Sequence, residues 1–311
     1  MEYIYERVGS KHYKDLAFLF EHCFNRNVGA TYFEKKFRTK NLGIEHIGYM
    51  AYTPEGFPAA YYGLYPVKIS YNNQDYIAAV SADTMTHTTH KRRGLFDLLS
   101  RKTFVLAKEE GIVLLYCFPN QLTLPGSYKL GWQYTEEEKM IHFSEKVYTL
   151  PLAKIARKNK LINKLYESYV AFIFRFYKKG VKHFENTLNG KDYAFIVHDD
   201  HYYSYKKYTK NHIINISGCN IWLKVDGELK IGDMQINEDI DFNHVLKKLK
   251  FLSFIIGNRE IQTTTSKESA IHHAFSKRQK GAETFCVGRI DMGLNFEKEK
   301  VKFVMADFDS F

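Results

Sequence analysis

The chain has 311 residues, of which 45% are hydrophobic and 16% aromatic, so a largely disordered protein is excluded and two ordinary domains fit. Lys and Arg outnumber Asp and Glu by 45 to 35, and the net charge of +10 favours anionic partners. Such anionic partners include phosphorylated cofactors, nucleotide-linked substrates, membrane surfaces and nucleic acids. The sequence lacks an apolar run long enough for a transmembrane segment and an N-terminal signal-peptide block. Four widely spaced cysteines favour reduced thiols, and we expect a cytoplasmic protein.

The first part of the chain predicts two helices, an antiparallel meander, a long helix and a buried strand. Pro-Glu-Gly and Asn-Asn between apolar runs are typical of hairpin turns. A wide apolar face that ends at Gly111 predicts the long helix, and the continuous apolar run after it predicts a central strand. Thr31 is the expected cap of the second helix. We expect helices at 15–24, 31–38, 94–110 and 120–130, and strands at 3–8, 44–52, 58–71, 75–86, 112–118 and 133–150.

Pro151 marks a boundary, and the basic segment that follows it predicts one long helix or a pair of helices over 154–188. We expect its aromatic side (Tyr166, Tyr169, Phe172 and Phe176) to pack on a domain, and a membrane-surface helix is the weaker alternative. The remainder repeats the order hairpin, helix, strand, helix, strand, which predicts a second domain of similar pattern. Its expected strands are 193–197, 213–216, 220–235, 260–264, 284–289 and 301–306, and its expected helices are 241–256 and 267–275.

A basic loop joins the strand over 75–86 to the helix over 94–110. Gly94 permits close approach of a ligand to the backbone, and the first amides of a helix have no intrahelical acceptor. Together with Lys91, Arg92 and Arg93 these amides predict a site for a diphosphate. The loop has no G-x-x-x-x-G-K-[ST] pattern, so nucleotide hydrolysis is not predicted.

The stretch T-H-T-T-H-K-R-R-G-L-F resembles the acetyl-CoA loop of the GCN5-related N-acetyltransferase (GNAT) family, whose usual pattern is [Q/R]-x-x-G-x-[G/A]. Lys91 replaces the Gln or Arg of that pattern, and Phe96 replaces its small residue. The distances along the chain from Gly94 to the next apolar strand, and from Asn120 to Gly131, match the family's spacing. F-P-N followed by K-L-G-W resembles a bacterial subgroup of the family.

The resemblance implies an α/β (α+β) fold with a mixed, mostly antiparallel central sheet flanked by helices, followed by a degenerate second GNAT-like domain. The expected domains are 1–150, which binds acetyl-CoA, the basic connecting helix 151–190, and 191–311, which lacks a phosphate loop. The implied activity is transfer of an acetyl group from acetyl-CoA to a small-molecule primary amine, with an amino sugar as one acceptor class. We expect neither a metal nor DNA as a partner, and the sequence leaves a homodimer open.

In the family, pantetheine lies between two parted central strands, and a backbone amide polarises the thioester carbonyl. The residues implied for the cofactor are Met85, Thr86, Lys91, Arg92, Arg93, Gly94, Leu95, Phe96 and Asn120. The family's Tyr acid aligns with Ser127, and we expect the adjacent Tyr128 to take this role, although it also suits simple packing. Asp83 is the candidate base, against an equally strong interpretation as a structural carboxylate. Glu45, His46 and the terminal carboxylates from Asp307 onward are alternatives, although chain ends usually fray.

Two other functions remain open at this point. The departures at Lys91, Phe96 and Ser127 allow a CoA-binding scaffold without catalysis, and the repeat with its basic helix allows an aminoacyl-tRNA-dependent transferase of double-GNAT architecture. His87 and His90 lie beside three cations, which disfavours metal binding. We interpret 198–201 as a turn, and 202–208 as an amphipathic segment rather than a stacking platform for a sugar or base.

Overall fold

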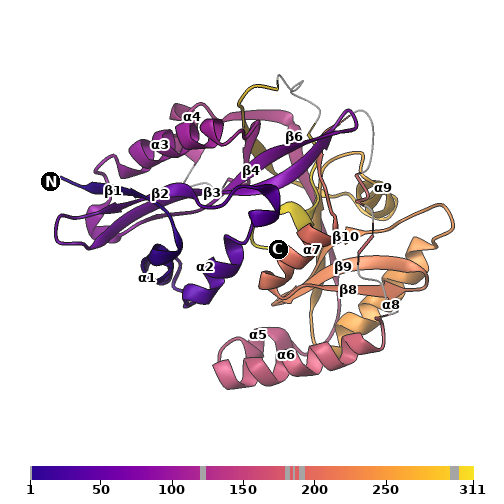
Figure 1. The fold of residues 1–311 in the computed structure, drawn as a ribbon. Coiled ribbons are helices and arrows are strands. Elements are labelled where there is room, and N and C mark those ends of the chain that lie inside the picture. The colour runs from indigo at the N-terminus through magenta and orange to yellow at the C-terminus, as the bar shows by residue number, and fades with distance from the viewer. Residues whose placement is uncertain (1, 120–123, 179–182, 185, 189–192, 295–300) are drawn as a thin grey trace. The chain divides into compact units, whose positions relative to one another are not determined.

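The computed structural model describes residues 2–119, 124–178, 183–184, 186–188, 193–294 and 301–311 (Figure 1). The chain forms two compact units: Met1–Glu137 with Phe285–Lys300, and Glu138–Thr284 with Val301–Phe311. The predicted domain limits at 150 and 190 stay a prediction. Within the described ranges, no helix has both the length and the apolar character that crossing a bilayer requires.

The sheet of the first unit is antiparallel except at one position. Its strands follow the order β1 to β5, and the end of β12 closes it beyond β5. Among the strand pairs described within this unit, β4–β5 is the parallel one, because α3 connects the two strands. Asn72 and Asn73 join β3 to β4 with φ of 52° and 59°, as a two-residue hairpin requires. The bounds are β1 Ile4–Arg7, β2 Ile47–Tyr52, β3 Pro58–Tyr71, β4 Gln74–Thr86, β5 Leu114–Cys117 and β12 Ala282–Asp291.

Helices cover both faces of this sheet: α1 (Tyr13–Phe24) and α2 (Ala30–Lys36) lie on one side, and α3 (Leu95–Glu109) and α4 (Leu124–Lys129) on the other (Figure 1). The apolar face of α3 predicted from the sequence packs in the core against β2 and β3, apart from Val105, which is 60% exposed. Gly29, not Thr31, precedes the first residue of α2, so the predicted cap was wrong.

The second unit repeats this strand arrangement. Its strands follow the order β8, β9, β10, β11, β6, and among these described strand pairs β10–β11 is the parallel one. Helix α8 connects the parallel strands as α3 does in the first unit, and α9 follows β11 as α4 follows β5. The bounds are β8 His212–Ile216, β9 Cys219–Asp226, β10 Glu228–Met234, β11 Glu260–Thr265, β6 Gln133–Lys146, α8 Phe242–Ile255 and α9 Ala270–Ser276.

The closing strands are exchanged between the two halves of the chain. β6 follows α4 in sequence, yet its residues Ile141–Lys146 pair with β11. β12 follows α9, yet its residues Gly288–Asp291 pair with β5. The predicted fold class, a mixed and mostly antiparallel sheet flanked by helices, is confirmed.

Several local expectations differ from the structure. The segment predicted as helical over 154–188 contains α5 (Leu152–Ala156) and α6 (Lys160–Arg175), followed by irregular chain at 176–178. The strand expected at 301–306 forms only single bridges at Val301 and Val304 before a short 3-10 turn. The C-terminal residues do not fray: Phe311 is buried, and Lys206 donates a hydrogen bond to the carbonyl of Phe308. The second unit also contains β7 (Phe195–Ile196) and α7 (Asp200–Lys206). α7 overlaps the predicted amphipathic segment 202–208 and begins inside the predicted turn 198–201, so that the turn prediction was wrong at residues 200 and 201.

Candidate functional site

The parallel strands β4 and β5 pair over a short length and then part. Their described pairs run from Ala78 with Leu114 to Val80 with Tyr116, whereas β4 continues to Thr86. Beyond the last pair, Asp83 and Thr84 together oppose one residue of β3, which is a β-bulge. Asp83 has a φ of 53°, and a bulge increases local twist and bends the strand. The bulge therefore bends β4 just beyond its last described pair with β5.

The backbone of Thr86 faces the side of β4 that points away from β3. The His87 N–H donates to the Ala59 carbonyl at 2.8 Å, and hydrogen-bonded pairs alternate along an antiparallel ladder. Thr86, one residue earlier, therefore directs its N–H and carbonyl toward the β5 side, where the carbonyl accepts from Cys23 Sγ at 3.5 Å. The Met85 side chain is buried in the unit. The Thr86 N–H is thus the donor at the edge where the two strands part.

The loop after β4 presents the uncapped start of α3. Arg92 and Gly94 both have left-handed backbone, with φ of 62° and 74°. No side chain caps α3 at Gly94, and a Cβ on Gly94 would have no atom within 4 Å. The first amides of α3, at Leu95 and Phe96, have no acceptor within the helix. Lys91 and Arg92 are exposed beside them, so this loop has the geometry of an anion site.

The two histidines of the loop are packing residues. The His90 ring is buried, and its Nδ1 lies 2.8 Å from the Tyr3 hydroxyl. The His87 ring stacks on His22 with centroids 3.8 Å apart. Burial lowers the pKa of both rings, so they add little positive charge to the loop at neutral pH. No group of three or more His, Cys, Asp or Glu suited to a metal occurs among the described residues.

Asp83 is held in a buried ion pair. Its carboxylate accepts from Lys36 Nζ at 2.5 Å and from the Tyr65 hydroxyl at 2.8 Å. The Tyr61 hydroxyl donates to Tyr65 at 3.3 Å, which extends the network. Lys36 is fully buried, and burial together with Asp83 raises the pKa of Tyr65 well above its usual value. This charged network holds the bulge in place and is largely shielded from solvent.

Two tyrosines lie near the end of α4, and only one of them was singled out from the sequence. Tyr128 is 57% exposed, and its ring lies 5.0 Å from that of Tyr134, centroid to centroid. The Tyr134 hydroxyl donates to Ser127 Oγ at 2.7 Å, and burial raises the pKa of Tyr134. Period-two alternation from the buried Trp132 is the signal that could have found Tyr134. Asn120 lies outside the described residues.

The alternative bases are also engaged with neighbours. His46 Nε2 lies 2.7 Å from the Tyr13 hydroxyl, and burial lowers the pKa of His46. Asp307, in the second unit, lies 2.8 Å from His198 Nε2. Asp233 approaches the other ring nitrogen of His198 at 3.5 Å, and both carboxylates are buried. His198, the first residue of the segment 198–201, therefore belongs to a buried network.

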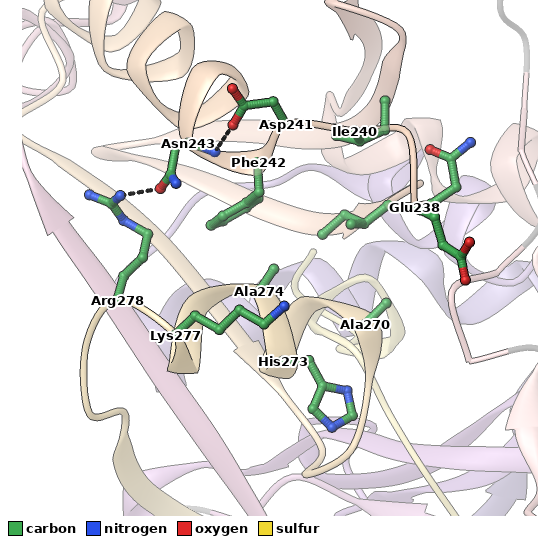
Figure 2. Close-up of a pocket in the computed structure, with 12 residues that line it drawn as sticks. Glu238, Ile240, Asp241, Phe242, Asn243, Ala270, His273, Ala274, Lys277 and Arg278 are labelled. Atoms are coloured by element: carbon green, nitrogen blue, oxygen red, sulfur yellow. Dashed lines mark hydrogen bonds between the residues drawn. The ribbon is translucent and has the colours of Figure 1, made fainter.

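The corresponding turn of the second unit, between β10 and α8, has the opposite character. The Asp241 carboxylate caps α8 by accepting from the Asn243 amide at 3.0 Å (Figure 2). It also accepts from the His244 amide at 3.2 Å. Glu238 and Asp239 precede it, so the loop is acidic. An open pocket of about 770 Å³ lies between this loop and α9. Its lining residues are Ile236, Asn237, Glu238, Ile240, Asp241, Phe242, Asn243, Ala270, His273, Ala274, Lys277 and Arg278.

In the second unit, the chain's own C-terminal segment lies where β10 and β11 part. Their described parallel pairs end at Lys230 with Gln262. Thr265 then pairs with β6 on one side and bridges to Val304, which must lie on its other side, toward β10. A Cβ on Gly232 would lie 2.3 Å from the Phe311 ring. Residues 301–311 thus occupy the place in the second unit that corresponds to the end of the β4–β5 pairing in the first.

Residues 5–135 match the family model described as the acetyltransferase (GNAT) domain. They form a GNAT domain. The whole chain has the fold of several solved structures at low sequence identity, and no curated protein matches its sequence.

Three of these structures cover 94% of the chain each. A GNAT from Kribbella flavida has a TM-score of 0.55 at 10% identity, with 72% of its own chain covered. A GNAT from Anabaena variabilis ATCC 29413 has a TM-score of 0.55 at 12% identity, with 74% covered. A conserved protein of unknown function from Enterococcus faecalis V583, described as a probable N-acyltransferase, has a TM-score of 0.59 at 11% identity, with 73% covered.

Proposed function

We propose that the protein is an acetyl-CoA-dependent N-acetyltransferase that acts on a small-molecule primary amine. The observation that carries this proposal is the uncapped, basic start of α3 beside the point where β4 and β5 part. Amides and cations at such a turn suit the diphosphate of CoA. In this proposal, residues 1–150 bind acetyl-CoA.

The cofactor residues follow from this placement. The amides of Leu95 and Phe96, with Lys91, Arg92 and Arg93, bind the diphosphate, and Gly94 keeps the helix end open. Pantetheine extends along the free edge of β4. There the Thr86 N–H donates to the thioester carbonyl, whose oxygen gains negative charge as the amine attacks. The buried Met85 side chain packs beneath this edge, and we propose Asn120 as a further cofactor contact.

The chemical step forms a C–N bond between the acceptor amine and the acetyl carbon and breaks the C–S bond to CoA. The amine must lose one proton, and we assign it to Asp83, either directly or through water. The CoA thiolate gains one proton, and we assign it to Tyr128, with Tyr134 as the alternative donor. Lys36 compensates the charge of Asp83 when this carboxylate is ionised.

A CoA-binding protein without catalysis is the second candidate, and the ion pair of Asp83 favours it. Lys36 and Tyr65 already bond to this carboxylate, so it is a less available base than a solvated one. The two candidates differ in one measurement. An acetyltransferase releases free CoA thiol when acetyl-CoA and a suitable amine, including amino sugars, are supplied, and the binding protein does not.

Protection against thermal unfolding by acetyl-CoA tests the binding step. We expect the unfolding temperature to rise with acetyl-CoA, as ligand linkage requires. The reference ligand is free pantetheine, which lacks the diphosphate and should protect much less. Equal protection by both ligands, or none by millimolar acetyl-CoA, contradicts the proposal.

A further inference from the structure

Helix α6 has apolar side chains on two opposite faces. Val170 and Phe174 are buried against the second unit. Leu161, Leu165, Phe172 and Phe176 follow at helical spacing on the opposite side. All four of these side chains are more than half exposed. Phe172 and Phe176 were expected to pack on a domain, and this prediction is wrong.

This exposed face continues onto the segments that pack beside α6. The Tyr166 and Tyr169 hydroxyls donate to the carbonyls of Ile256 and Ile255, which fixes α6 against the end of α8. Thr149 donates to the Phe254 carbonyl and brings the chain before α5 to the same place. We call the whole set the α5–α6 surface. Its exposed members are Tyr148, Leu150, Leu152, Ile155, Leu161, Ile162, Leu165, Tyr169, Phe172, Phe176, Phe251 and Phe254.

The α5–α6 surface is also strongly basic. Between Tyr148 and Lys178 the only acidic residue is Glu167, and Lys210 pairs with it. Lys154 and Arg157 pair with Glu228 and Asp226 elsewhere in the unit. The other cations of this segment have no acidic partner within the described part of the chain: Lys158, Lys160, Lys164, Arg175 and Lys178.

We propose that the α5–α6 surface docks on an anionic lipid surface. A helix that lies in the membrane interface inserts apolar side chains below the headgroups, and its cations meet the anionic headgroups. A second copy of the chain fits less well. A two-fold interface places the same patch on both sides, so it would bring the unpaired cations of two copies together.

Flotation of the full chain with lipid vesicles tests the proposal. We expect the protein to float with vesicles of phosphatidylcholine containing roughly one third phosphatidylglycerol, and about tenfold less with phosphatidylcholine alone. Raising the salt from about 0.1 to about 0.5 M should weaken binding, because the cations are exposed. Absence of flotation with the anionic vesicles at low salt overturns the proposal.

Two variants connect the result to the α5–α6 surface. The double change Leu165→Glu with Phe172→Glu should reduce flotation about tenfold or more, because two carboxylates replace inserting side chains. Val105→Glu, at an exposed apolar position of α3, is the matched control and should float like the unmodified chain. Equal flotation of the double variant and the unmodified chain contradicts the proposal. A dimer in light scattering that the double variant abolishes assigns the surface to a second copy instead.

Discussion

The two halves of the chain share one framework but differ at the start of the helix that follows the bulged strand. Both have a strand with a bulge, β4 and β10, that leaves its parallel neighbour and leads into a helix. In the first half, Gly94 leaves the helix end open and the loop is basic. In the second half, Asp241 caps the helix, and residues 301–311 fill the gap between the strands. The same framework thus ends in an open, basic helix start in one half and in a capped, acidic one in the other.

The buried carboxylates at the two bulges sharpen this comparison. Asp83 is neutralised by Lys36, whereas Asp233 lies beside His198. Burial by itself lowers the pKa of His198, but the hydrogen bond to Asp307 and the nearby carboxylate of Asp233 raise it to about 9. Both bulges therefore have a cation beside the carboxylate, and the raised pKa of His198 places its titration in a moderately alkaline range.

The largest effect is expected at the first bulge. Asp83→Asn leaves Lys36 buried without its carboxylate, and breaking such a pair costs about 3–5 kcal/mol of unfolding free energy. Urea unfolding measures this loss. The double change Asp83→Asn with Lys36→Met removes both charges and should recover most of the stability. A single variant within about 1 kcal/mol of the unmodified chain would show that the pair does not hold the bulge.

The second bulge should be sensitive to pH. His198 has a folded-state pKa above its unfolded value, so its contribution is complete below about pH 6.5. This contribution, on the order of 3 kcal/mol, is lost as the pH rises toward the folded pKa of about 9. The unfolding free energy from pH 6 to 9.5 should therefore fall. His198→Gln, which cannot titrate, should start lower and show a flatter profile, and parallel profiles would refute this assignment.

Giving the start of α3 an acidic cap, like the one at the start of α8, tests the proposed anion site. Gly94→Asp places a carboxylate at the cap and should lower acetyl-CoA affinity about 100-fold, or about 2.8 kcal/mol. Calorimetric titration measures the affinity. Gly94→Asn is the matched control, because it caps the helix and tolerates positive φ without adding charge, and it should lose less affinity. Unchanged affinity in Gly94→Asp would remove α3 from the proposed site.

The smallest effect is expected at the start of α8. Asp241→Ala removes the bonds to the Asn243 and His244 amides and should cost about 1 kcal/mol of unfolding free energy. It should not create a second acetyl-CoA site, because Glu238 and Asp239 remain and residues 301–311 still fill the gap. Stoichiometry from calorimetry checks this point. Binding of two equivalents of acetyl-CoA by Asp241→Ala would mean that the Asp241 cap alone prevents the second half from binding acetyl-CoA.

Much of the fold followed from local patterns. The apolar face of α3, the paired asparagines before β4 and the continuous apolar run of β5 act over a few residues, so the sequence predicted these elements near their observed limits. The exchange of β6 and β12 has no such signal, because a strand carries the same alternation whichever neighbour it pairs with. The burial of Phe311 was missed for a similar reason, since its partners are distant in sequence.

The candidate site likewise has features that are local in sequence and contacts that join distant segments. The basic residues, Gly94 and the start of α3 are contiguous in sequence, so the amino-acid order by itself determined an open, cationic helix end. The partner of Asp83 is Lys36, and residues 301–311 meet β11 near Thr265; both contacts join distant segments. Only the tertiary structure decided them, because burial and charge pairing depend on which elements pack together.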